Sequence, residues 1–127
     1  MPEKHLYEYA IIRFVPCIER EEFINVGIIL FSKRQKYIRV AYHIDEEKIA
    51  FFAPDTDIES LCCHLRVFER ICSGEKEGGV IASFDIPERF RWLTAVRSTI
   101  IQTSRPHPGF LTDPDATFDK LFDEFVM

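Results

Sequence analysis

Two polar residues, Arg13 and Asn25, interrupt apolar segments that have the composition of β-strands. Arg13 lies in LYEYAIIRFV (6–15), whereas Asn25 and Gly27 lie in FINVGIILFS (23–32). A guanidinium among apolar neighbours must be paired and hydrogen-bonded, because burying an unpaired charge is costly. A glycine inside a strand indicates a bulge or the close approach of another group. The pattern predicts either a polar pocket, in which Arg13 holds an anion and Gly27 leaves room for it, or a structural ion pair beside a β-bulge.

A carboxylate on a predicted helix (57–73) is a candidate partner for this arginine. At about 100° per residue, Glu69 falls at the edge of the apolar arc of that helix. A carboxylate in that position should meet a cation, and Arg13 and Arg97 are the candidates. The alternative is that Glu69 extends from the rim of the helix into solvent.

Four arginines follow one another closely in the second half of the chain, with aromatic residues among them. Arginine with interleaved aromatic side chains can bind phosphate or stack on bases. The alternative is that these arginines pair with the acidic residues that predominate in the chain. Their spacing matches no nucleic-acid-binding motif. The residues are Arg89, Phe90, Arg91, Trp92, Arg97 and Arg105.

The remaining reactive residues predict neither a metal site nor a catalytic nucleophile. Cys62, Cys63 and His64 are too close together on one helix to form a zinc site by themselves. There is no G-x-S-x-G, phosphate-binding loop or dinucleotide-binding glycine pattern, so no cofactor is expected. The four cysteines include an adjacent pair and no C-x-x-C, which favours reduced, mostly buried thiols.

The composition is that of one globular domain, residues 1–127, with 46% hydrophobic and 29% charged residues. The formal net charge of -5 disfavours a nucleic-acid or anionic-membrane partner. No apolar stretch has the length that spans a bilayer. The first residues also lack the apolar run of a signal peptide, so we expect a cytoplasmic protein.

Three strands, at 6–15, 23–32 and 37–44, are separated by short polar loops and should form an antiparallel meander. If the first loop is centred near Glu19, Arg13 lies opposite Asn25, and Ile11 lies opposite Gly27. In the third strand, alternation directs one set of side chains to the core and the other outward. The inward set is Ile38, Val40, Tyr42 and Ile44, and the outward set is Arg39 and His43.

Two amphipathic helices are predicted from their caps and apolar stripes. The first, at 57–73, has Thr56 as its N-cap in a capping box with Glu59, and Gly74 just past its end. The last begins at Asp113 with Pro114 in its first turn. The fold class is therefore α+β: an antiparallel, meander-type β-sheet with an amphipathic helix packed on it and a C-terminal helix.

The other segments are less regular. We expect short strands at 80–84 and 98–103, a solvated turn at 45–47 and a loop at 105–115. Residues 87–97 are ambiguous, and Pro87 could open a helical turn there.

Two segments together resemble a bacterial family known as domain of unknown function 3037. They are Y-x-Y-A-I-I-R-F-V-P followed by E-E-F-I-N-V-G-I-I-L, and F-R-W-L-T-A-V-R-S-T-I-I-Q-T-S followed by D-P and a final L-F. The resemblance covers nearly the whole chain. It implies that members often lie beside genes for HipA-like kinases, which suggests an accessory or antitoxin-like role. Carried onto this chain, the family pattern falls on Arg13, Glu22, Asn25, Gly27, Trp92, Arg97, Ser98 and Gln102.

Three functions follow as hypotheses. The first is a non-catalytic accessory or binding protein that docks on a protein partner, for which a HipA-like kinase is the candidate. The second is an enzyme acting on a phosphate ester, a nucleotide or a nucleic acid, with Arg13 and Arg97 holding phosphate and Glu22 or Glu69 as base. The third is a subunit of a homo-oligomer that associates through an exposed apolar patch.

Overall fold

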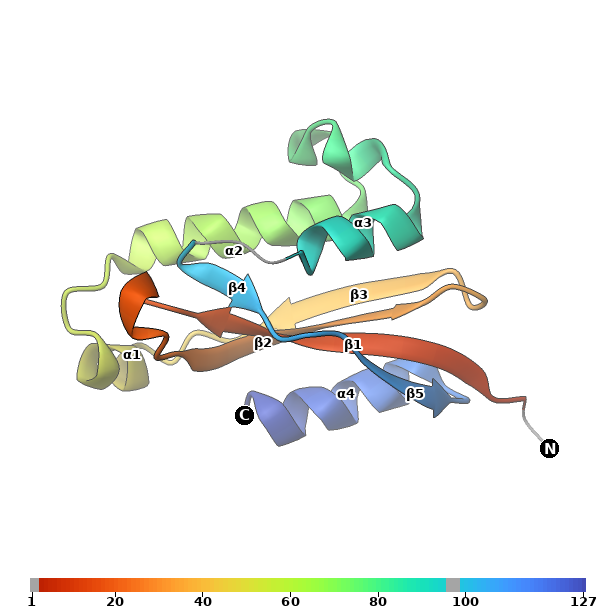
Figure 1. Ribbon diagram of the computed structural model, residues 1–127, viewed down its shortest axis with the longest axis horizontal. Helices are drawn as coiled ribbons and strands as arrows, with labels where there is room; N and C mark the ends of the chain where they lie inside the picture. Colours follow the sequence, from red (N-terminus) through yellow and green to blue (C-terminus); the bar gives the residue numbers. More distant parts are fainter. Residues whose placement is uncertain (1–2, 96–98) are drawn as a thin grey trace.

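Two long apolar strands, β1 (His5–Phe14) and β2 (Ile24–Ser32), form the centre of an antiparallel sheet. The computed structural model describes residues 3–95 and 99–127. β3 (Tyr37–Tyr42) continues the meander on the outer side of β2. The order is β3-β2-β1-β4, and a fifth strand also pairs with β1 (Figure 1). The predicted α+β class and antiparallel sheet are confirmed.

The outer edge of β1 is shared by two short strands that follow each other in the chain. β4 (Ile101–Thr103) pairs with the end of β1, and β5 (His107–Leu111) pairs with its beginning. Between them, the buried Ser104 accepts a hydrogen bond from the backbone N of Ile11 at 2.9 Å. β5 lies in the segment predicted to be a loop. That prediction was wrong because an edge strand tolerates the proline and glycine found there.

Four helices pack around this sheet, with α2 and α3 on one face and α4 on the other (Figure 1). Their N-caps are all aspartates, whose side chains accept hydrogen bonds from backbone N–H groups of the first turn. Within the described residues, no helix combines the length and apolar character needed to cross a membrane. The helices are α1 (Glu46–Phe52), α2 (Ile58–Ser73), α3 (Ile86–Leu93) and α4 (Pro114–Phe125).

Several local predictions are corrected by these elements. The acidic run at 45–47 caps and begins α1 instead of forming a turn. Asp57 caps α2 in place of Thr56, whose hydroxyl donates to the carbonyl of Ala53 at 2.7 Å. The predicted strand at 80–84 is a 3-10 turn (Ile81–Ser83). The other 3-10 turns are Ile18–Arg20 and Lys76–Gly78.

Alternate side chains of β1 enter two separate cores. One core lies under α2 and α3, and the other lies under α4. The inward set predicted for β3 does pack in the first core. Arg39 does not project freely outward as predicted, because its guanidinium lies 4.3 Å from the Phe118 ring and 3.2 Å from Asp115 Oδ1 on α4. The β1 residues are Ala10, Ile12 and Phe14 in the first core, and Tyr7, Tyr9 and Ile11 against the second.

The cysteines are less buried than the sequence led us to expect. All four are free, but only Cys72 is buried, whereas Cys63 is exposed. Cys17 and Cys62 are intermediate.

A β-bulge in β2 sets the position of the polar residues. Arg13 lies opposite Asn25 as predicted, but Ile12, not Ile11, lies opposite Gly27, because the register shifts by one residue in between. A Cβ atom on Gly27 would lie 2.6 Å from the carbonyl oxygen of Ala41 on β3. Gly27 therefore permits the close approach of β3, and it does not leave room for a ligand.

Candidate functional site

Arg13, Asn25 and Gln102 form a row across three neighbouring strands. In the sheet register, Arg13 of β1 lies directly opposite Asn25 of β2 on one side and opposite Gln102 of β4 on the other. Directly opposed residues of antiparallel strands present their side chains on the same face. The fold thus joins two sequence segments that are far apart in the chain, and three predicted site residues meet.

Arg13 lies on the face of the sheet that α4 covers, next to Tyr9 and Ile11 in the alternation of β1. Its guanidinium carbon stacks 4.1 Å from the centroid of the Phe23 ring. Its Nε is buried without a hydrogen-bond partner, and none of the described carboxylates forms an ion pair with it. A half-buried guanidinium with an unsatisfied donor is a candidate binding group.

The two amides beside Arg13 are held by backbone carbonyls. Asn25 Nδ2 donates to the carbonyl of Phe125 at 3.3 Å, which ties β2 to the end of α4. Gln102 Nε2 donates to the carbonyl of Thr99 at 2.9 Å. Asn25 Oδ1 is buried without a donor. The row therefore contains one donor atom of Arg13 and one acceptor atom of Asn25 that are buried and lack a hydrogen-bond partner.

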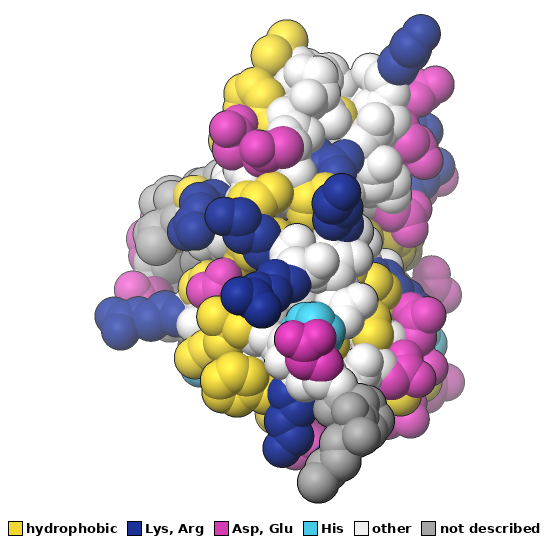
Figure 2. Space-filling view, turned by 90° about the vertical axis from the view of Figure 1, so that its right-hand side faces the viewer, with side chains coloured by type: hydrophobic (Ala, Val, Ile, Leu, Met, Phe, Trp, Pro, Cys, Tyr) yellow, Lys and Arg dark blue, Asp and Glu magenta, His cyan; other side chains and the backbone are white. Residues whose placement is uncertain are grey.

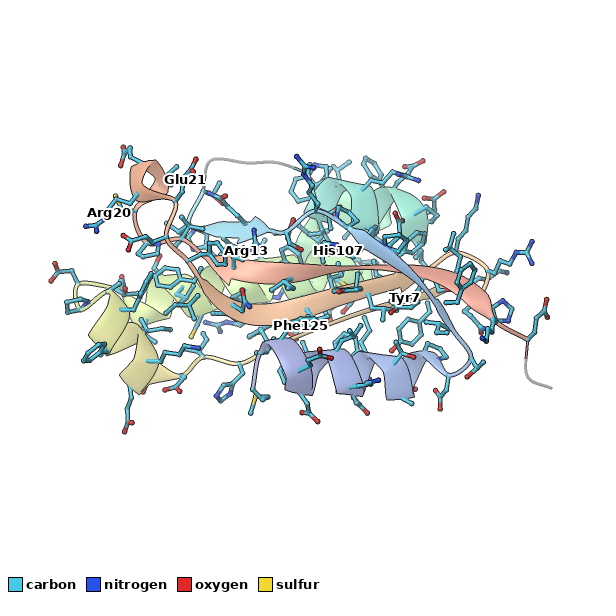
Figure 3. The ribbon with its side chains drawn as sticks, turned by 60° about the horizontal axis from the view of Figure 1, so that its bottom comes forward. Tyr7, Arg13, Arg20, Glu21, His107 and Phe125 are labelled. Atoms are coloured by element: carbon cyan, nitrogen blue, oxygen red, sulfur yellow. The ribbon has the colours of Figure 1, made fainter. Side chains whose placement is uncertain are left out.

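Beside this row, the described helices cover the β1 side of the sheet face less fully than the β2 and β3 side. α4 packs on β2 and β3 and leaves side chains of β1 and β5 half-buried or exposed. We call this surface the open strip. Figure 3 turns toward the reader the face of the sheet on which the open strip and α4 lie. From Tyr7 to Arg13 it is about 20 Å long, at about 3.3 Å per strand residue. The open strip consists of Tyr7, Tyr9, Ile11, Arg13 and His107.

Aromatic contacts order this surface. The Tyr9 ring lies 5.3 Å from His107 and 6.0 Å from Phe125 of α4, measured between ring centroids. Tyr7 lies 6.1 Å from Tyr9. Burial, and secondarily the neighbouring Tyr9, raises the pKa of Tyr7 above its ordinary value, so the phenol stays neutral near neutral pH. The open strip is a preformed aromatic surface that ends in one cation.

The other predicted site residues lie elsewhere. Glu22 pairs with Arg20 at 2.6 Å on the surface and lines a cavity of about 580 Å³ at the end of the sheet. Trp92 lines a groove of about 300 Å³ between α2, α3 and β4. Arg97 and Ser98 lie outside the described residues.

Glu69 does not meet Arg13, because α2 packs on the opposite face of the sheet. Tyr42, which faces the core under α2, has its pKa raised by burial and then by the charge of Glu69. Glu69 is therefore close to Tyr42 and separated by the sheet from Arg13. The predicted pairing of Glu69 with Arg13 is therefore wrong, whereas the alternative pairing with Arg97 lies outside the described residues.

This arrangement is suited to binding. A general base would have to lie within hydrogen-bond reach of a group held by Arg13. Of the two predicted bases, Glu22 is paired with Arg20 and Glu69 is on the other face. In the part of the chain that the structure describes, the side chains that flank Arg13 in the row are amides, which can hold a ligand.

The sequence contained a signal for part of the open strip. Tyr7, Tyr9, Ile11 and Arg13 alternate in the first strand, which places them on one face. His107 was missed because it lies in the segment predicted to be a loop. Phe23, which precedes β2, stacks on the guanidinium of Arg13, and this contact was not predicted from the sequence.

The comparisons with known proteins agree with the resemblance seen in the sequence. No curated protein and no solved structure matches the chain. A family model described as "Protein of unknown function (DUF3037)" matches residues 9–126, a span that begins within β1 and includes β2, the row around Arg13 and α4. The chain therefore belongs to the DUF3037 family of proteins of unknown function.

Proposed function

We propose that this chain is a non-catalytic, cytoplasmic binding protein that docks a helix of a protein partner on the open strip. The observation that carries the proposal is Arg13, a half-buried cation with an unsatisfied Nε at the end of an aromatic surface. Buried or half-buried charge is retained when it is paired. Because no described carboxylate of this chain pairs with Arg13, the partner supplies one.

The architecture favours a helix as the docked element. One face of the sheet carries α2 and α3, whereas the other carries α4 alone (Figure 1). α4 shows how a helix fits this face, since its Phe125 reaches across to Tyr9. A strip about 20 Å long matches a helix of about 13 residues at 1.5 Å per residue.

The composition of the open strip supports the same conclusion. Tyrosine and arginine are enriched among the residues that dominate binding energy at protein interfaces. The rings of Tyr7 and Tyr9 would pack on an apolar stripe of the partner helix. An aspartate or glutamate near one end of that helix would bond to the guanidinium of Arg13.

A HipA-like kinase is the first partner to test, since the family resemblance points to it. The kinase is co-expressed with this chain, and the dissociation constant is measured by titration calorimetry. Arg13→Gln should weaken the complex about tenfold or more, because a hydrogen bond to a charged group contributes about 1.5–3 kcal/mol. Tyr9→Ser should weaken it further by removing the centre of the aromatic surface.

Two controls make the result decisive. Arg20→Gln removes another arginine, which is exposed and paired with Glu22, and should leave the affinity unchanged. Circular dichroism establishes that each variant is folded. Wild-type affinity in both Arg13→Gln and Tyr9→Ser would refute the open strip as the docking surface. Self-association that is lost in the same two variants would instead identify a second copy of the chain as the occupant.

A further inference from the structure

A hollow of about 400 Å³ lies at the other end of β1, between the N-terminal residues, the turn that joins β2 to β3, and β5. Figure 2 looks at this end of the molecule, where lysine and arginine side chains gather beside hydrophobic ones. The hollow is distinct from the row around Arg13, since it surrounds the first residues of β1. Its lining residues include Lys4, His5, Leu6, Phe31, Arg34 and Phe110.

Cations predominate in this hollow, although the chain as a whole is acidic. Lys4, Lys33 and Arg34 line it, against the single carboxylate of Glu8. None of these three cations forms an ion pair within the part of the chain that the structure describes. With a net charge of -5 for the chain, such an excess of positive charge is local to this end.

Apolar side chains are exposed beside these cations. Leu6 and Phe110 lie opposite each other on β1 and β5, and their exposed fractions are 55% and 71%. Phe31 forms part of the floor and is fixed by stacking on Phe90, with 5.0 Å between ring centroids. Exposed apolar side chains that cluster in a hollow indicate a binding surface.

His5 adds an unsatisfied polar group to the same hollow. Its Nδ1 is buried without a hydrogen-bond partner. A buried unpaired nitrogen carries a free-energy cost that a bound donor or acceptor would remove.

We propose that this hollow binds an acidic peptide segment in which a large apolar side chain lies next to carboxylates. The carboxylates would lie against Lys33 and Arg34, and the apolar side chain would pack on Leu6 and Phe110. An extended polyanion such as nucleic acid fits less well, because it would run from this small basic end over a surface that is acidic overall. The hollow shares Tyr7 with the open strip but lies at the opposite end of β1 from Arg13, and the proposal does not depend on the role of Arg13.

Fluorescence anisotropy of labelled peptides tests this site. The probe is the acetylated peptide Glu-Leu-Glu-Phe-Glu, and its matched control is Gln-Leu-Gln-Phe-Gln. The acidic peptide should bind about tenfold more tightly, because each exposed charge pair contributes up to about 1 kcal/mol. Its affinity should fall as salt is added. Equal binding of the two peptides, or binding of neither, would overturn the proposal.

Substitutions place the peptide on the structure. The double variant Lys33→Gln/Arg34→Gln should lose most of the preference for the acidic peptide, and Phe110→Ser should weaken the binding of both peptides. Lys120→Gln, at an exposed position of α4, should have no effect. Arg13→Gln should also have no effect on peptide binding. The test of the hollow can therefore fail without refuting the open strip as a docking surface, and the reverse also holds. Tighter binding of an oligothymidylate, lost in the same double variant, would assign the hollow to nucleic acid and refute the peptide.

Discussion

Replacing Gly27 with alanine tests whether β2 and β3 approach each other as closely as the structure indicates. The new Cβ would lie 2.6 Å from the carbonyl oxygen of Ala41, 3.0 Å from Tyr42 Cβ and 3.2 Å from Ile12 Cδ1. The nearest of these atoms belongs to the backbone of β3, so it can retreat only if the strand shifts. Overpacking of this kind typically costs about 1–3 kcal/mol. We expect Gly27→Ala to lower the free energy of unfolding by about 2 kcal/mol.

Gly109 provides the matched comparison, because a Cβ there would be equally crowded by a different kind of neighbour. It would lie 2.7 Å from ring atoms of Tyr7, at the end of a side chain that can rotate away. The cost is then limited to the ring contact with Tyr9, on the order of 0.5–1.5 kcal/mol. Alanine also stabilises a strand interior by about 0.5–1 kcal/mol relative to glycine, because its backbone loses less conformational entropy on folding, and this offsets the lost ring contact. Gly109→Ala should therefore be close to neutral.

Urea denaturation followed by far-UV circular dichroism measures both free energies. The midpoint for Gly27→Ala should fall clearly below those of the wild type and of Gly109→Ala, with the slope of the transition unchanged. Equal stability of the two variants would refute the argument that a backbone obstacle costs more than a side-chain obstacle. A Gly27→Ala variant as stable as the wild type would show that β3 is not in contact at this point.

Two further predictions concern buried groups. Ser104→Ala leaves the backbone N–H of Ile11 without its acceptor and should lower the free energy of unfolding by about 1–3 kcal/mol. The control Ser73→Ala changes an exposed serine and should leave the free energy of unfolding unchanged. Thermal denaturation of the two variants measures this difference. Burial raises the pKa of the Cys72 thiol from its ordinary 9.0 to about 12. The folded state then keeps a proton that the unfolded state loses, so stability should decrease as the pH rises from 9.0 to about 12, by at most about 1.4 kcal/mol per pH unit from this group. Urea midpoints over this range should fall less steeply for Cys72→Ala, and an unchanged slope would contradict this role of the thiol.

The centre of the sheet could be predicted because β1 and β2 are long, apolar and separated by a polar connection. The register of Arg13 and Asn25 was also correct, since a connection centred near Glu19 places the two residues opposite each other. Gly27 indicated a bulge or a close approach, and the structure has both, but the residue at which the register shifts could not be derived from the sequence. β5 was missed because its proline and glycine have the composition of a loop, and only its pairing with β1 makes it a strand.

The candidate site was predicted in part. The polar character of Arg13 and Asn25 within apolar strands indicated them directly, whereas Gln102 came from the family resemblance alone. A helical wheel correctly placed Glu69 at the rim of α2, but the wheel contains no information about which face of the sheet a helix covers. That choice separated Glu69 from Arg13 and left the arginine without the partner assigned to it.

The shared outer edge of β1 has a consequence for how the protein forms during synthesis. β1 is synthesised well before the strands that complete its hydrogen bonding, which are found far along the chain at 101–111. Until then, an apolar strand with unpaired backbone groups is available to any other nascent chain, which is the usual route to aggregation. Completion of this sheet must therefore wait until residues 101–111 have been synthesised, and products truncated before them are the ones expected to need chaperones.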